Sequence, residues 1–540
     1  MCGGTRLQKW MAECIRHLVL SGLAEPALLI RDVTPSRPAS VSARTFLYDI
    51  YDLHWVRKRC PASRDVDMEA ELGAIPRLDC AVTTQGTWSQ HFSAHDIDAI
   101  KSHDLDFILR FGFNIIRGEI LQSARYGVWS YHHDDEHKYR GGPPCFWELY
   151  HGDDTTGAIL QRLTDRLDGG IILHRGVFGT CKGSWIANFD RALSGSADWC
   201  ARVCAEISDG QLERVNGTPT PSTAAIRHAP HHAQFLRFVM RTSREVLRKT
   251  WQLMFHEEVW NIAFIEEELA QIIRSGRIVG STLWVEPHED GHFLADPFPC
   301  GGELLVEDYD QAGKGKLSRL CPPFVPNELS LRPAIDRAEH LSYPCVFVDG
   351  EKIYCVPEAY QAERAIIYER RVEGWREAHS ILHGVKVVDP TLFMHEGRYW
   401  LFYSLQDDGA FGNLKLYAHY AETMSGEWRP HLLNPLKCDI TSSRSAGQVA
   451  RVDGRLYRPA QDCSRTYGGA LTINEVLVLT PTRFEERVTA RLMPDADGPY
   501  PDGLHTVNAM GKRTVIDGKR FVFDLWAWRN NWRRAREILL

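Results

Sequence analysis

The chain has 540 residues, 44% of them hydrophobic and 25% charged, and this balance excludes a globally disordered protein. Its 70 acidic and 63 basic residues leave a net charge of -7, which argues against a general nucleic-acid-binding protein. Fourteen cysteines occur without a Cys-x-x-Cys pair, and the sequence shows neither a signal-peptide pattern nor an apolar run of membrane-spanning length, so we expect a protein of the reducing cytoplasm.

Residues 1–208 alternate helix-like and strand-like segments. Apolar spacing predicts, in chain order, a helix at 7–23, a strand at 27–33, a helix at 41–56 with Phe46, Ile50 and Leu53 on one face, and strands at 106–110 and 127–132. Such alternation is typical of a Rossmann-type α/β domain with a mostly parallel sheet. Only Met1 and Cys2 precede Gly3-Gly4, where a first strand is expected, so that strand is predicted to be truncated or absent.

A linker and a helix are expected next, over 209–254. Residues 209–230 are rich in Gly, Pro, Ser and Thr, a composition that favours a linker. Residues 235–255 have helical spacing with basic residues between the apolar ones. This pattern predicts a helix that packs one face and exposes the other to solvent.

From residue 255 the pattern changes to short strands joined by turns. An acidic residue and a glycine precede an aromatic or apolar run five times, at Asp290-Gly291, Asp349-Gly350, Glu396-Gly397, Asp453-Gly454 and Asp517-Gly518. Each pair suits a tight hairpin turn, because glycine accepts a positive φ. Intervals of roughly 47 to 64 residues are typical of propeller blades. We therefore expect an all-β five-bladed propeller over 255–525, with an unrelated β-sandwich of five hairpins as the alternative.

The remaining tail, residues 526–540, interleaves tryptophan with arginine. The residues are Trp526, Trp528, Trp532, Arg529, Arg533, Arg534 and Arg536. An amphipathic helix packed on the propeller is the favoured interpretation, and a segment that binds phosphate or a partner is the alternative.

The densest polar segment, residues 127–144, runs from a strand into a loop. In open α/β sheets ligands bind at the carboxyl ends of strands, so this loop is the predicted site. Three histidines and three acidic residues fall between 132 and 137, a composition that a metal site can have. Neighbouring residues point in different directions, however, so only some of them can converge, and we predict no metal here.

This segment resembles the core of the folate-dependent formyltransferases, which include methionyl-tRNA, glycinamide ribonucleotide and sugar N-formyltransferases. The resemblance runs without a gap from Gly127 to about Leu173, and its motifs are Gly127-Val128 to His132, Lys138-Tyr139-Arg140-Gly141, Gly152-Asp153, Thr156-Gly157 and Leu167-Asp168-Gly169-Gly170. It implies a Rossmann-type fold and 10-formyltetrahydrofolate as the formyl donor.

The resemblance also implies the catalytic residues. The family uses an Asn, a His and an Asp, which fall here on Ser130, His132 and Asp168. His132 would stabilise the oxyanion that forms when an amine attacks the formyl carbon. Asp168 would hold the imidazole in the right tautomer, raise its pKa and help to relay the amine's proton. Ser130 departs from the family pattern, although its hydroxyl can still donate a hydrogen bond.

Binding residues follow from the same resemblance. Phe111, Gly112, Phe113, Ile116 and Asp165 are expected to wall the folate pocket. For the amine substrate the expected residues are His133, Arg140 and Gly141, with His133 also the nearest candidate for a second oxyanion donor.

The C-terminal half resembles five-bladed propellers of the arabinanase type and the propeller domain of plant glucosamine inositolphosphorylceramide transferases. Residues 388–400 and 293–298 carry this resemblance. Propeller glycosidases place two carboxylates across a central pocket. The acidic residues at predicted inner-strand positions are Asp296, Glu358, Asp389, Asp462 and Asp524. Binding of a sugar-like or phosphorylated acceptor, or an architectural role, is favoured over glycoside hydrolysis.

These observations favour an N-formyltransferase that moves a formyl group from 10-formyltetrahydrofolate to an amine of a sugar-linked or natural-product small molecule. The alternative is a carbohydrate-binding or glycan-processing propeller protein with a degenerate formyltransferase domain. The expected partner is the small-molecule amine, with neither nucleic acid nor membrane as a partner. The expected organisation is an α/β domain over 1–208, a linker and helix over 209–254, the propeller over 255–525 and a tail over 526–540.

Overall fold

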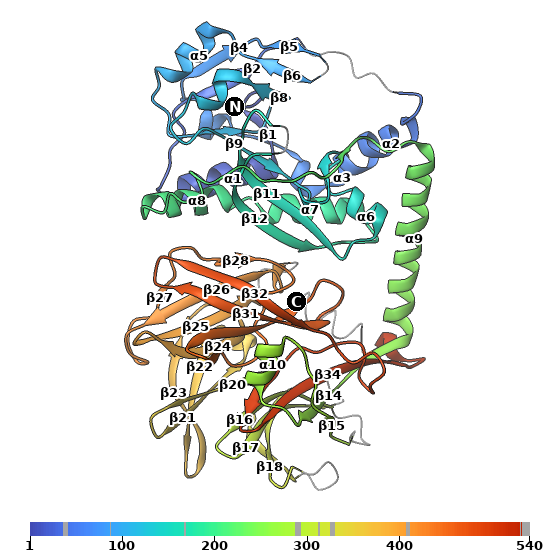
Figure 1. The fold of residues 1–540 in the computed structure, drawn as a ribbon, viewed down its shortest axis with the longest axis vertical. Coiled ribbons are helices and arrows are strands. Elements are labelled where there is room, and N and C mark those ends of the chain that lie inside the picture. Colours follow the sequence, from blue (N-terminus) through green and yellow to red (C-terminus); the bar gives the residue numbers. More distant parts are fainter. Residues whose placement is uncertain are drawn as a thin grey trace. The chain divides into compact units, whose positions relative to one another are not determined.

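In a computed structural model of the chain, the described residues are 1–35, 42–86, 88–166, 169–286, 293–310, 314–324, 330–406, 411–529 and 531. The chain divides into two units, unit 1 (Met1–Val246) and unit 2 (Leu247–Leu540) (Figure 1). The boundary falls within helix α9, His232–Phe255, which was expected from the spacing of residues 235–255.

Unit 1 is an α/β structure. Its helices are α1 (Lys9–Leu20), α2 (Phe46–Tyr51), α3 (Arg57–Arg59), α4 (Glu69–Leu72), α5 (Ala94–Lys101), α6 (Trp147–His151), α7 (Trp185–Gly195) and α8 (Trp199–Ser208), with short η segments at Asp52–Val56, Pro61–Ser63 and Gly118–Gln122. Its strands are β1 (Arg6–Gln8), β2 (Leu29–Asp32), β3 (Asp65–Asp67), β4 (Arg77–Cys80), β5 (Thr83–Gln85), β6 (Ser89–His91), β7 (Ile108–Arg110), β8 (Ile115–Arg117), β9 (Val128–His132), β10 (Arg140–Gly141), β11 (Thr155–Arg162), β12 (Ile171–Gly179) and β13 (Ile226–Arg227).

The main sheet of unit 1 has the order β12-β11-β9-β7, with β7 and β9 parallel and the other pairs antiparallel. β2 and β4 form a second parallel pair, and Met1 and Cys2 lie between this pair and β7. Cys2 N donates to Ile30 O at 3.0 Å, and the Met1 amine donates to Leu109 O at 3.0 Å. These two residues therefore occupy the place between β2 and β7 where a first strand is expected.

Two predicted features of unit 1 differ in the structure. Phe46, Ile50 and Leu53 are 49%, 43% and 55% exposed, so the predicted apolar face of that helix is wrong. The tyrosines of α2 turn inward instead, because Tyr48 and Tyr51 lie against the ring of Trp185. The segment 209–230, which was expected to be a linker, packs on unit 1: β13 pairs with β10, Val215 is buried, and Thr220 N donates to Gly170 O.

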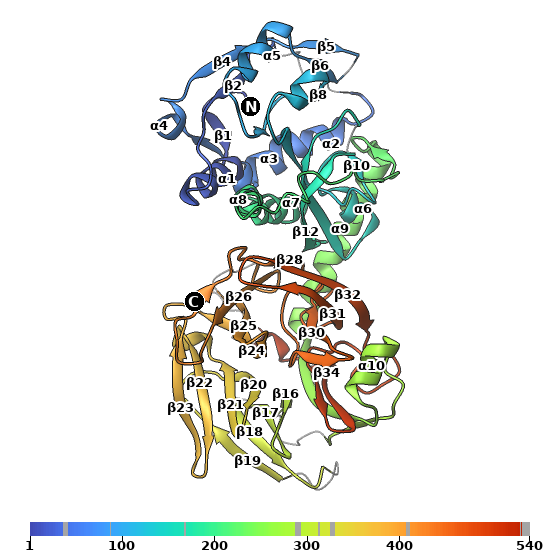
Figure 2. The same ribbon diagram turned by 60° about the vertical axis from the view of Figure 1, so that its left-hand side comes forward.

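Within the described residues, the strands of unit 2 form five antiparallel sheets, and Figure 2 shows them around a common centre. The first sheet holds β14 (His256–Ile265), β15 (Thr282–Trp284), β33 (Val507–Met510) and β34 (Arg513–Phe523), and the second holds β16 (Phe293–Cys300), β17 (Glu303–Tyr309), β18 (Gly315–Cys321) and β19 (Ser330–Ile335). The third sheet holds β20 (Ser342–Asp349), β21 (Lys352–Glu358), β22 (Ala365–Arg371) and β23 (Gly374–Ile381). The fourth sheet holds β24 (Val387–His395), β25 (Arg398–Leu405), β26 (Lys415–Ala421), β27 (Arg429–Pro430) and β28 (Lys437–Cys438), and the fifth holds β29 (Ala450–Val452), β30 (Arg455–Asp462), β31 (Ala470–Leu479) and β32 (Phe484–Leu492). Two short helical segments are α10 (Leu269–Ser275) and η4 (Tyr360–Ala362).

The first strands of three successive sheets share one backbone feature. Asp296, Tyr343 and Asp389 each precede a proline and have φ values of 50°, 43° and 45°. The pairing of each strand with the next shifts its register at that point. A bulge with a positive φ re-aims the side chain that carries it. The same irregularity, repeated from sheet to sheet, gathers these side chains at the centre of the unit.

The sheets of unit 2 form a closed ring. Tyr343 N donates to Asp296 Oδ2 at 3.0 Å, and Asp296 N donates to Asp517 Oδ2 at 3.1 Å, which links β20, β16 and β34. β14, at the start of the unit, pairs with β34, near its end, along the whole length of β14. One sheet thus joins both ends of the unit, as in propellers, whose radial repetition leaves only short, protected strand edges.

The predicted hairpin turns are correct at three places. Gly350, Glu396-Gly397 and Asp453-Gly454 have positive φ values and join consecutive strands. Asp517-Gly518 is a correction, because the pair lies inside β34 rather than in a turn, and Gly518 leaves room for the ring of Trp284. Asp290-Gly291 lies outside the described residues.

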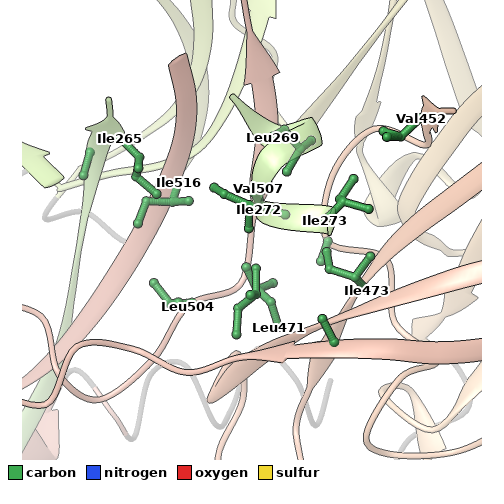
Figure 3. Packing of buried hydrophobic residues seen from close by; sticks show 14 residues of the cluster. Ile265, Leu269, Ile272, Ile273, Val452, Leu471, Ile473, Leu504, Val507 and Ile516 are labelled. Carbon is green, nitrogen blue, oxygen red and sulfur yellow. The ribbon is translucent and has the colours of Figure 1, made fainter. Parts of the chain in front are cut away.

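An apolar core joins the first and fifth sheets of unit 2 with α10 (Figure 3). Leu471 and Ile473 on β31 are fully buried among Ile272, Ile273 and Val507. Burial of this kind stabilises the fold through removal of apolar surface from water and close packing.

We expect the Ile473→Ala variant to lose about 2–5 kcal/mol in its free energy of unfolding, because the deleted atoms leave a cavity in this core. Urea unfolding followed by tryptophan fluorescence measures the loss. Leu477→Ala on the same strand is the matched control, since Leu477 is 49% exposed. Equal stability of the two variants would contradict the packing described here.

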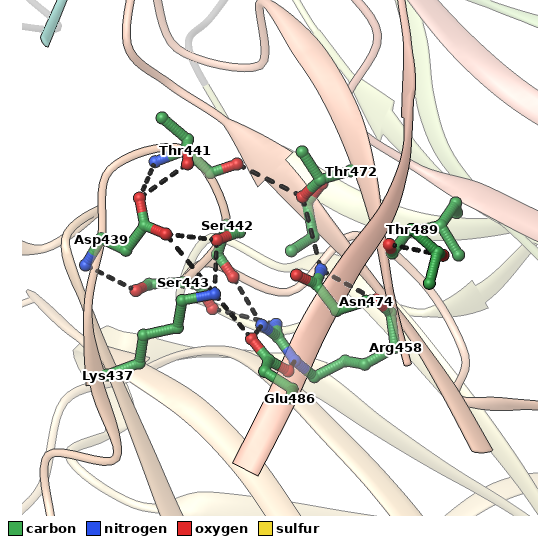
Figure 4. Close-up of polar contacts among 12 residues, drawn as sticks. Lys437, Asp439, Thr441, Ser442, Ser443, Arg458, Thr472, Asn474, Glu486 and Thr489 are labelled. Atoms are coloured by element: carbon green, nitrogen blue, oxygen red, sulfur yellow. Dashed lines mark hydrogen bonds and ion pairs between the residues drawn. The ribbon is translucent and has the colours of Figure 1, made fainter. Parts of the chain in front are cut away.

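A buried ion-pair network joins β28 of the fourth sheet to β30 and β32 of the fifth (Figure 4). The Arg458 guanidinium, which is 0% exposed, donates to both carboxylate oxygens of Glu486 at 2.9 and 2.7 Å. Lys437 Nζ donates to Glu486 Oε1 at 2.8 Å. Burial alone would raise the pKa of Glu486, but Arg458 and Lys437 outweigh burial and lower it to about 2.

The Glu486→Gln variant is expected to lose about 3–5 kcal/mol of stability at pH 7, because it leaves the buried Arg458 charge without its carboxylate. A lowered pKa means that the stabilisation is complete above the ordinary carboxylate pKa and is lost as the pH falls toward 2. Urea titrations should therefore show a smaller difference in the free energy of unfolding between wild type and variant at pH 3 than at pH 7. Glu373→Gln, at a 70% exposed side chain, should have the same free energy of unfolding as wild type at both pH values.

Candidate functional site

The predicted catalytic histidine stands at the carboxyl end of strand β9. His132 is the last residue of β9, which lies between β7 and β11 in the main sheet of unit 1. Its Nε2 is 3.3 Å from Tyr139 O and 3.9 Å from Asp134 Oδ2, and its side chain keeps 11% of its surface exposed. The imidazole thus lies at the edge of the sheet where α/β proteins bind ligands.

Ser130 is held by an arginine from the neighbouring strand. Arg110, the last residue of β7, is the register partner of Ser130. Its Nε and Nη2 donate to Ser130 Oγ at 3.2 and 2.9 Å, and Ser130 is 2% exposed. Because side chains two residues apart on a strand share a face, Ser130 and His132 lie on one face of the sheet. A guanidinium therefore lies beside the position where the family has its Asn.

Arg110 also fixes the loop that follows β7. Its Nη1 donates to Phe113 O at 2.9 Å and to Asn114 O at 2.7 Å, and Phe113 has a φ of 64°. Sequence reasoning missed Arg110. The signal that could have found it is a charged residue at the end of an apolar strand, directly before Phe111-Gly112-Phe113.

The residues assigned to the folate pocket divide into two groups. Ile116 is buried in the interior of unit 1, whereas Phe111 is half-buried, has its ring 5.4 Å from that of Trp10, and lines a cavity of about 920 Å³ with Met1 and Cys2. Gly112 leaves room for the Cys2 backbone, which a Cβ would meet at 2.9 Å. Phe113 is half-buried beside Phe92, and Asp165 is exposed, with its Oδ1 3.4 Å from Gly118 N. Phe111, Phe113 and Asp165 are thus the three of the five whose side chains are accessible to a ligand.

Asp168 lies outside the described residues, as does Leu167. The two glycines that follow are described. Gly170 N donates to Gln161 Oε1 at 3.1 Å, and Gln161 is the register partner of Ser130 on β11. The Gly169-Gly170 end of the motif is therefore connected to β11, one strand away from Ser130.

His133 is placed differently from its predicted role. Its Nε2 lies 3.1 Å from Ser196 Oγ, and its ring stacks on Tyr131 and meets the edge of Trp10. Complete burial lowers the pKa of His133 to about 3, so the ring is neutral at physiological pH. Adjacent strand residues point to opposite faces, so the ring turns away from that of His132 and gives no support to substrate binding or to oxyanion donation.

Arg140 and Gly141 form the short strand β10, which pairs with β13. Arg140 Nη1 donates to Ala224 O at 3.4 Å, and Gly141, with a φ of 88°, leaves no room for a Cβ because of Arg227 O. Gly141 is thus explained by close backbone packing, while Arg140 remains half-buried beside the polar loop.

Two buried carboxyl groups that the sequence analysis did not assign follow β9 along the chain, Asp134 beside His132 and Glu148 beside Asp134. Asp134 accepts from Cys145 N at 2.8 Å and is 1% exposed. Glu148 on α6 is fully buried, and burial, reinforced by Asp153, raises its pKa to about 8. The side chains of Glu148 and Asp134 interact with each other, and Asp134 is the member of this pair that lies beside the imidazole of His132.

Unit 2 brings a second polar cluster together at its centre. The Asp389 carboxylate pairs with Arg444 and accepts from Gln461 Nε2 at 2.9 Å. Glu358 Oε2 accepts from Asp389 N at 3.0 Å and lies 3.7 Å from Arg444 Nη2. One guanidinium thus serves two carboxyl groups, and burial together with Asp389 raises the pKa of Glu358 well above its ordinary value.

Asp296, His505 and Asp517 lie next to that group. Their ligand atoms are within 4.8 Å of one another, a spacing that suits a metal ion. Asp517 Oδ1 already accepts from His505 N and Thr506 N, and Thr506 Oγ1 donates to Asp296 Oδ1 at 2.6 Å. Burial raises the pKa of Asp296 to about 6. Asp462 and Asp524 lie apart, Asp462 paired with Arg491 and Asp524 accepting from Trp526 N.

Comparison with known proteins gives relatives for parts of the chain. The family described as glucosamine inositolphosphorylceramide transferase 1, N-terminal, matches residues 329–498, which lie in unit 2. The enzyme of that name from Arabidopsis thaliana is 35% identical over 161 residues, 28% of this chain and 20% of its own length. A methionyl-tRNA formyltransferase from Agathobacter rectalis is 27% identical over 120 residues, 22% of this chain and 39% of its own.

Both of these relatives are transferases by name, and this chain spans about a fifth of the length of the plant enzyme and two fifths of the bacterial one. Among solved structures, the α-L-arabinofuranosidase from Podospora anserina is 14% identical with a TM-score of 0.33, covering 42% of this chain and 80% of its own.

Proposed function

We propose that the protein is an N-formyltransferase that moves a formyl group from 10-formyltetrahydrofolate to an amine of a small molecule. The observation that carries the proposal is the position of His132 at the carboxyl end of β9, with Ser130 and Arg110 on the same face of the sheet. The similarity to a methionyl-tRNA formyltransferase, which also suggested the role of His132, supports it.

The side chains present suit this chemistry. When bound, the donor supplies a formyl carbon that the amine attacks, and the amine's proton replaces the formyl group on the donor nitrogen. His132 donates a hydrogen bond where the oxyanion develops, and the positive charge of Arg110 lies on the same side. The carboxyl group of Asp134 lies 3.9 Å from Nε2 of His132. The loop that Arg110 pins, together with Asp165, is the part of unit 1 that would hold the donor.

The acceptor is proposed to be a sugar-linked amine. The plant relative is named for glucosamine, which is an amino sugar, and the matched residues lie in unit 2. The net charge of -7 disfavours a polyanionic acceptor such as tRNA.

Release of tetrahydrofolate, followed with glucosamine, other amino sugars and amino acids as acceptors, tests the proposal. Turnover with at least one amine supports it. If no amine is formylated and calorimetry detects no binding of a folate analogue, the proposal fails.

A second candidate function is favoured by Ser130, whose hydroxyl is held by Arg110 where the family has a free amide. In that case unit 1 is a degenerate transferase domain and unit 2 binds a glycan. Binding of the full chain on a glycan array that the His132→Ala substitution leaves unchanged, together with an absence of formyl transfer, would favour this candidate.

A further inference from the structure

Helix α9 exposes a continuous apolar stripe. Its members are Leu236, Met240, Leu247, Trp251 and Met254, which are 52%, 66%, 70%, 56% and 43% exposed. At 100° per residue these five positions fall within an arc of about 60°. Val239, Val246 and Leu253, all exposed, extend the apolar arc to about 160°. This apolar stripe runs along nearly the whole helix.

The other side of α9 is basic. Arg237, Arg241, Arg244, Arg248 and Lys249 occupy it with a single acidic residue, Glu245. Four of the five basic residues are exposed, and Arg241 is half-buried. The whole chain carries a net charge of -7, so this helix is a positively charged element of a negatively charged protein.

A second exposed apolar group adjoins the C-terminal end of α9. Asn531 Nδ2 donates to Leu253 O and His256 O at 2.9 Å, and the ring of Phe523 stacks on Phe255 at 6.2 Å. Between these contacts, Leu525, Trp526 and Trp528 are 62%, 57% and 46% exposed, and the Arg529 guanidinium lies over the Trp526 ring. Tryptophan and arginine together are typical of groups that lie at a lipid interface.

We propose that α9 is a docking surface for an anionic lipid bilayer, lying in the plane of the headgroups with its apolar stripe inserted. A helix with a wide apolar arc, tryptophan at its border and a lysine- and arginine-rich opposite face has the composition of interfacial helices. Each basic residue near the surface adds attraction to anionic lipids. Among the described residues no helix is long and apolar enough to cross a membrane, so the contact is peripheral.

A second copy of the chain is a poorer occupant. Two α9 helices packed along their stripes would bring Arg244 and Arg248 of both copies to the borders of one seam, with only Glu245 to compensate. Like charges beside a helical seam oppose pairing. The basic face instead complements phosphate and carboxylate headgroups. This surface departs from the expectation of a protein without a membrane partner.

Co-sedimentation of the full chain with vesicles tests the proposal. We expect binding to phosphatidylcholine vesicles that contain 30% phosphatidylserine and at least 10-fold weaker binding to pure phosphatidylcholine. Leu247→Gln with Trp251→Ser, and separately Arg244→Glu with Lys249→Glu, should each weaken binding at least 10-fold. Val372→Ser and Arg376→Glu, at 102% and 71% exposed positions of unit 2, are the matched controls and should bind like wild type.

Circular dichroism and thermal unfolding establish that the α9 variants remain folded, as expected for exposed positions. Equal binding to both kinds of vesicle, or binding to neither, overturns the proposal. So does a concentration-dependent dimer in light scattering that the Trp251→Ser substitution abolishes without any binding to vesicles, because the occupant would then be a second copy.

Discussion

The His132→Ala variant is expected to lower kcat/KM for formyl transfer by about 10²–10⁴-fold while the protein remains folded. The imidazole stands at the carboxyl edge of the sheet, keeps 11% of its side chain exposed, and makes one contact with a backbone oxygen, Tyr139 O at 3.3 Å. A developing oxyanion would lose its donor with the imidazole, and because this side chain is mostly buried its removal is also expected to lower the free energy of unfolding.

Tetrahydrofolate release at a fixed acceptor concentration measures this effect, and thermal unfolding checks the fold. His137→Ala is the matched control, because His137 is in the same loop and its side chain is 50% exposed. Activity of His132→Ala within about 3-fold of wild type would show that the histidine is not catalytic.

The strands that carry the candidate site could be predicted because their apolar runs are continuous. The structure has β7 at Ile108–Arg110 and β9 at Val128–His132, inside the segments expected at 106–110 and 127–132. The contact between Arg110 and Ser130 could not be predicted, because it depends on which residues of two parallel strands face each other. Register is set by tertiary packing, and one residue of slip would send Arg110 to the other face.

Unit 2 shows the same division between local and non-local information. Glu396-Gly397 and Asp453-Gly454 form turns because two consecutive positive φ values suit a short hairpin. Asp517-Gly518 has the same composition, yet it lies within β34, where pairing with β14 and room for Trp284 decide the conformation. At this position the ten-residue pairing of β14 with β34, which closes the ring, outweighs the local preference of Asp-Gly for a turn.

The central acids illustrate a further limit. Asp296 and Asp389 could be selected from sequence because each begins an Asp-Pro pair on an inner strand. The contacts of Asp389 with Arg444 and Gln461 could not be predicted, because these residues are far from Asp389 in the sequence and no local pattern connects them. A carboxylate held in this way is a weak general base, since proton uptake would break a buried ion pair. This argument supports an architectural or binding role for the centre over hydrolysis.

The Arg110→Met variant is expected to lower kcat/KM for formyl transfer by about 10²–10³-fold, because the positive charge beside the developing oxyanion is lost. Ser130 Oγ accepts two N–H groups of Arg110, and its own proton faces Tyr131 O at 3.4 Å, so the guanidinium rather than the hydroxyl supplies positive charge at this point. Adding Ser130→Asn to Arg110→Met should recover at least 10-fold, because the amide restores the donor that the family pattern has at this position.

A separate measurement distinguishes this role from positioning of the loop that Arg110 holds. Calorimetry with an unreactive folate analogue reports donor binding alone, and Arg110→Met should keep its affinity within about 3-fold if the arginine acts on the oxyanion. A large loss of donor affinity that Ser130→Asn does not repair would instead assign Arg110 to holding Phe113 and Asn114. Arg125→Met, at a 70% exposed side chain in the loop before β9, is the control for loss of one positive charge. The double variant is decisive because an amide at residue 130 can replace a hydrogen-bond donor but cannot reach across to pin the loop.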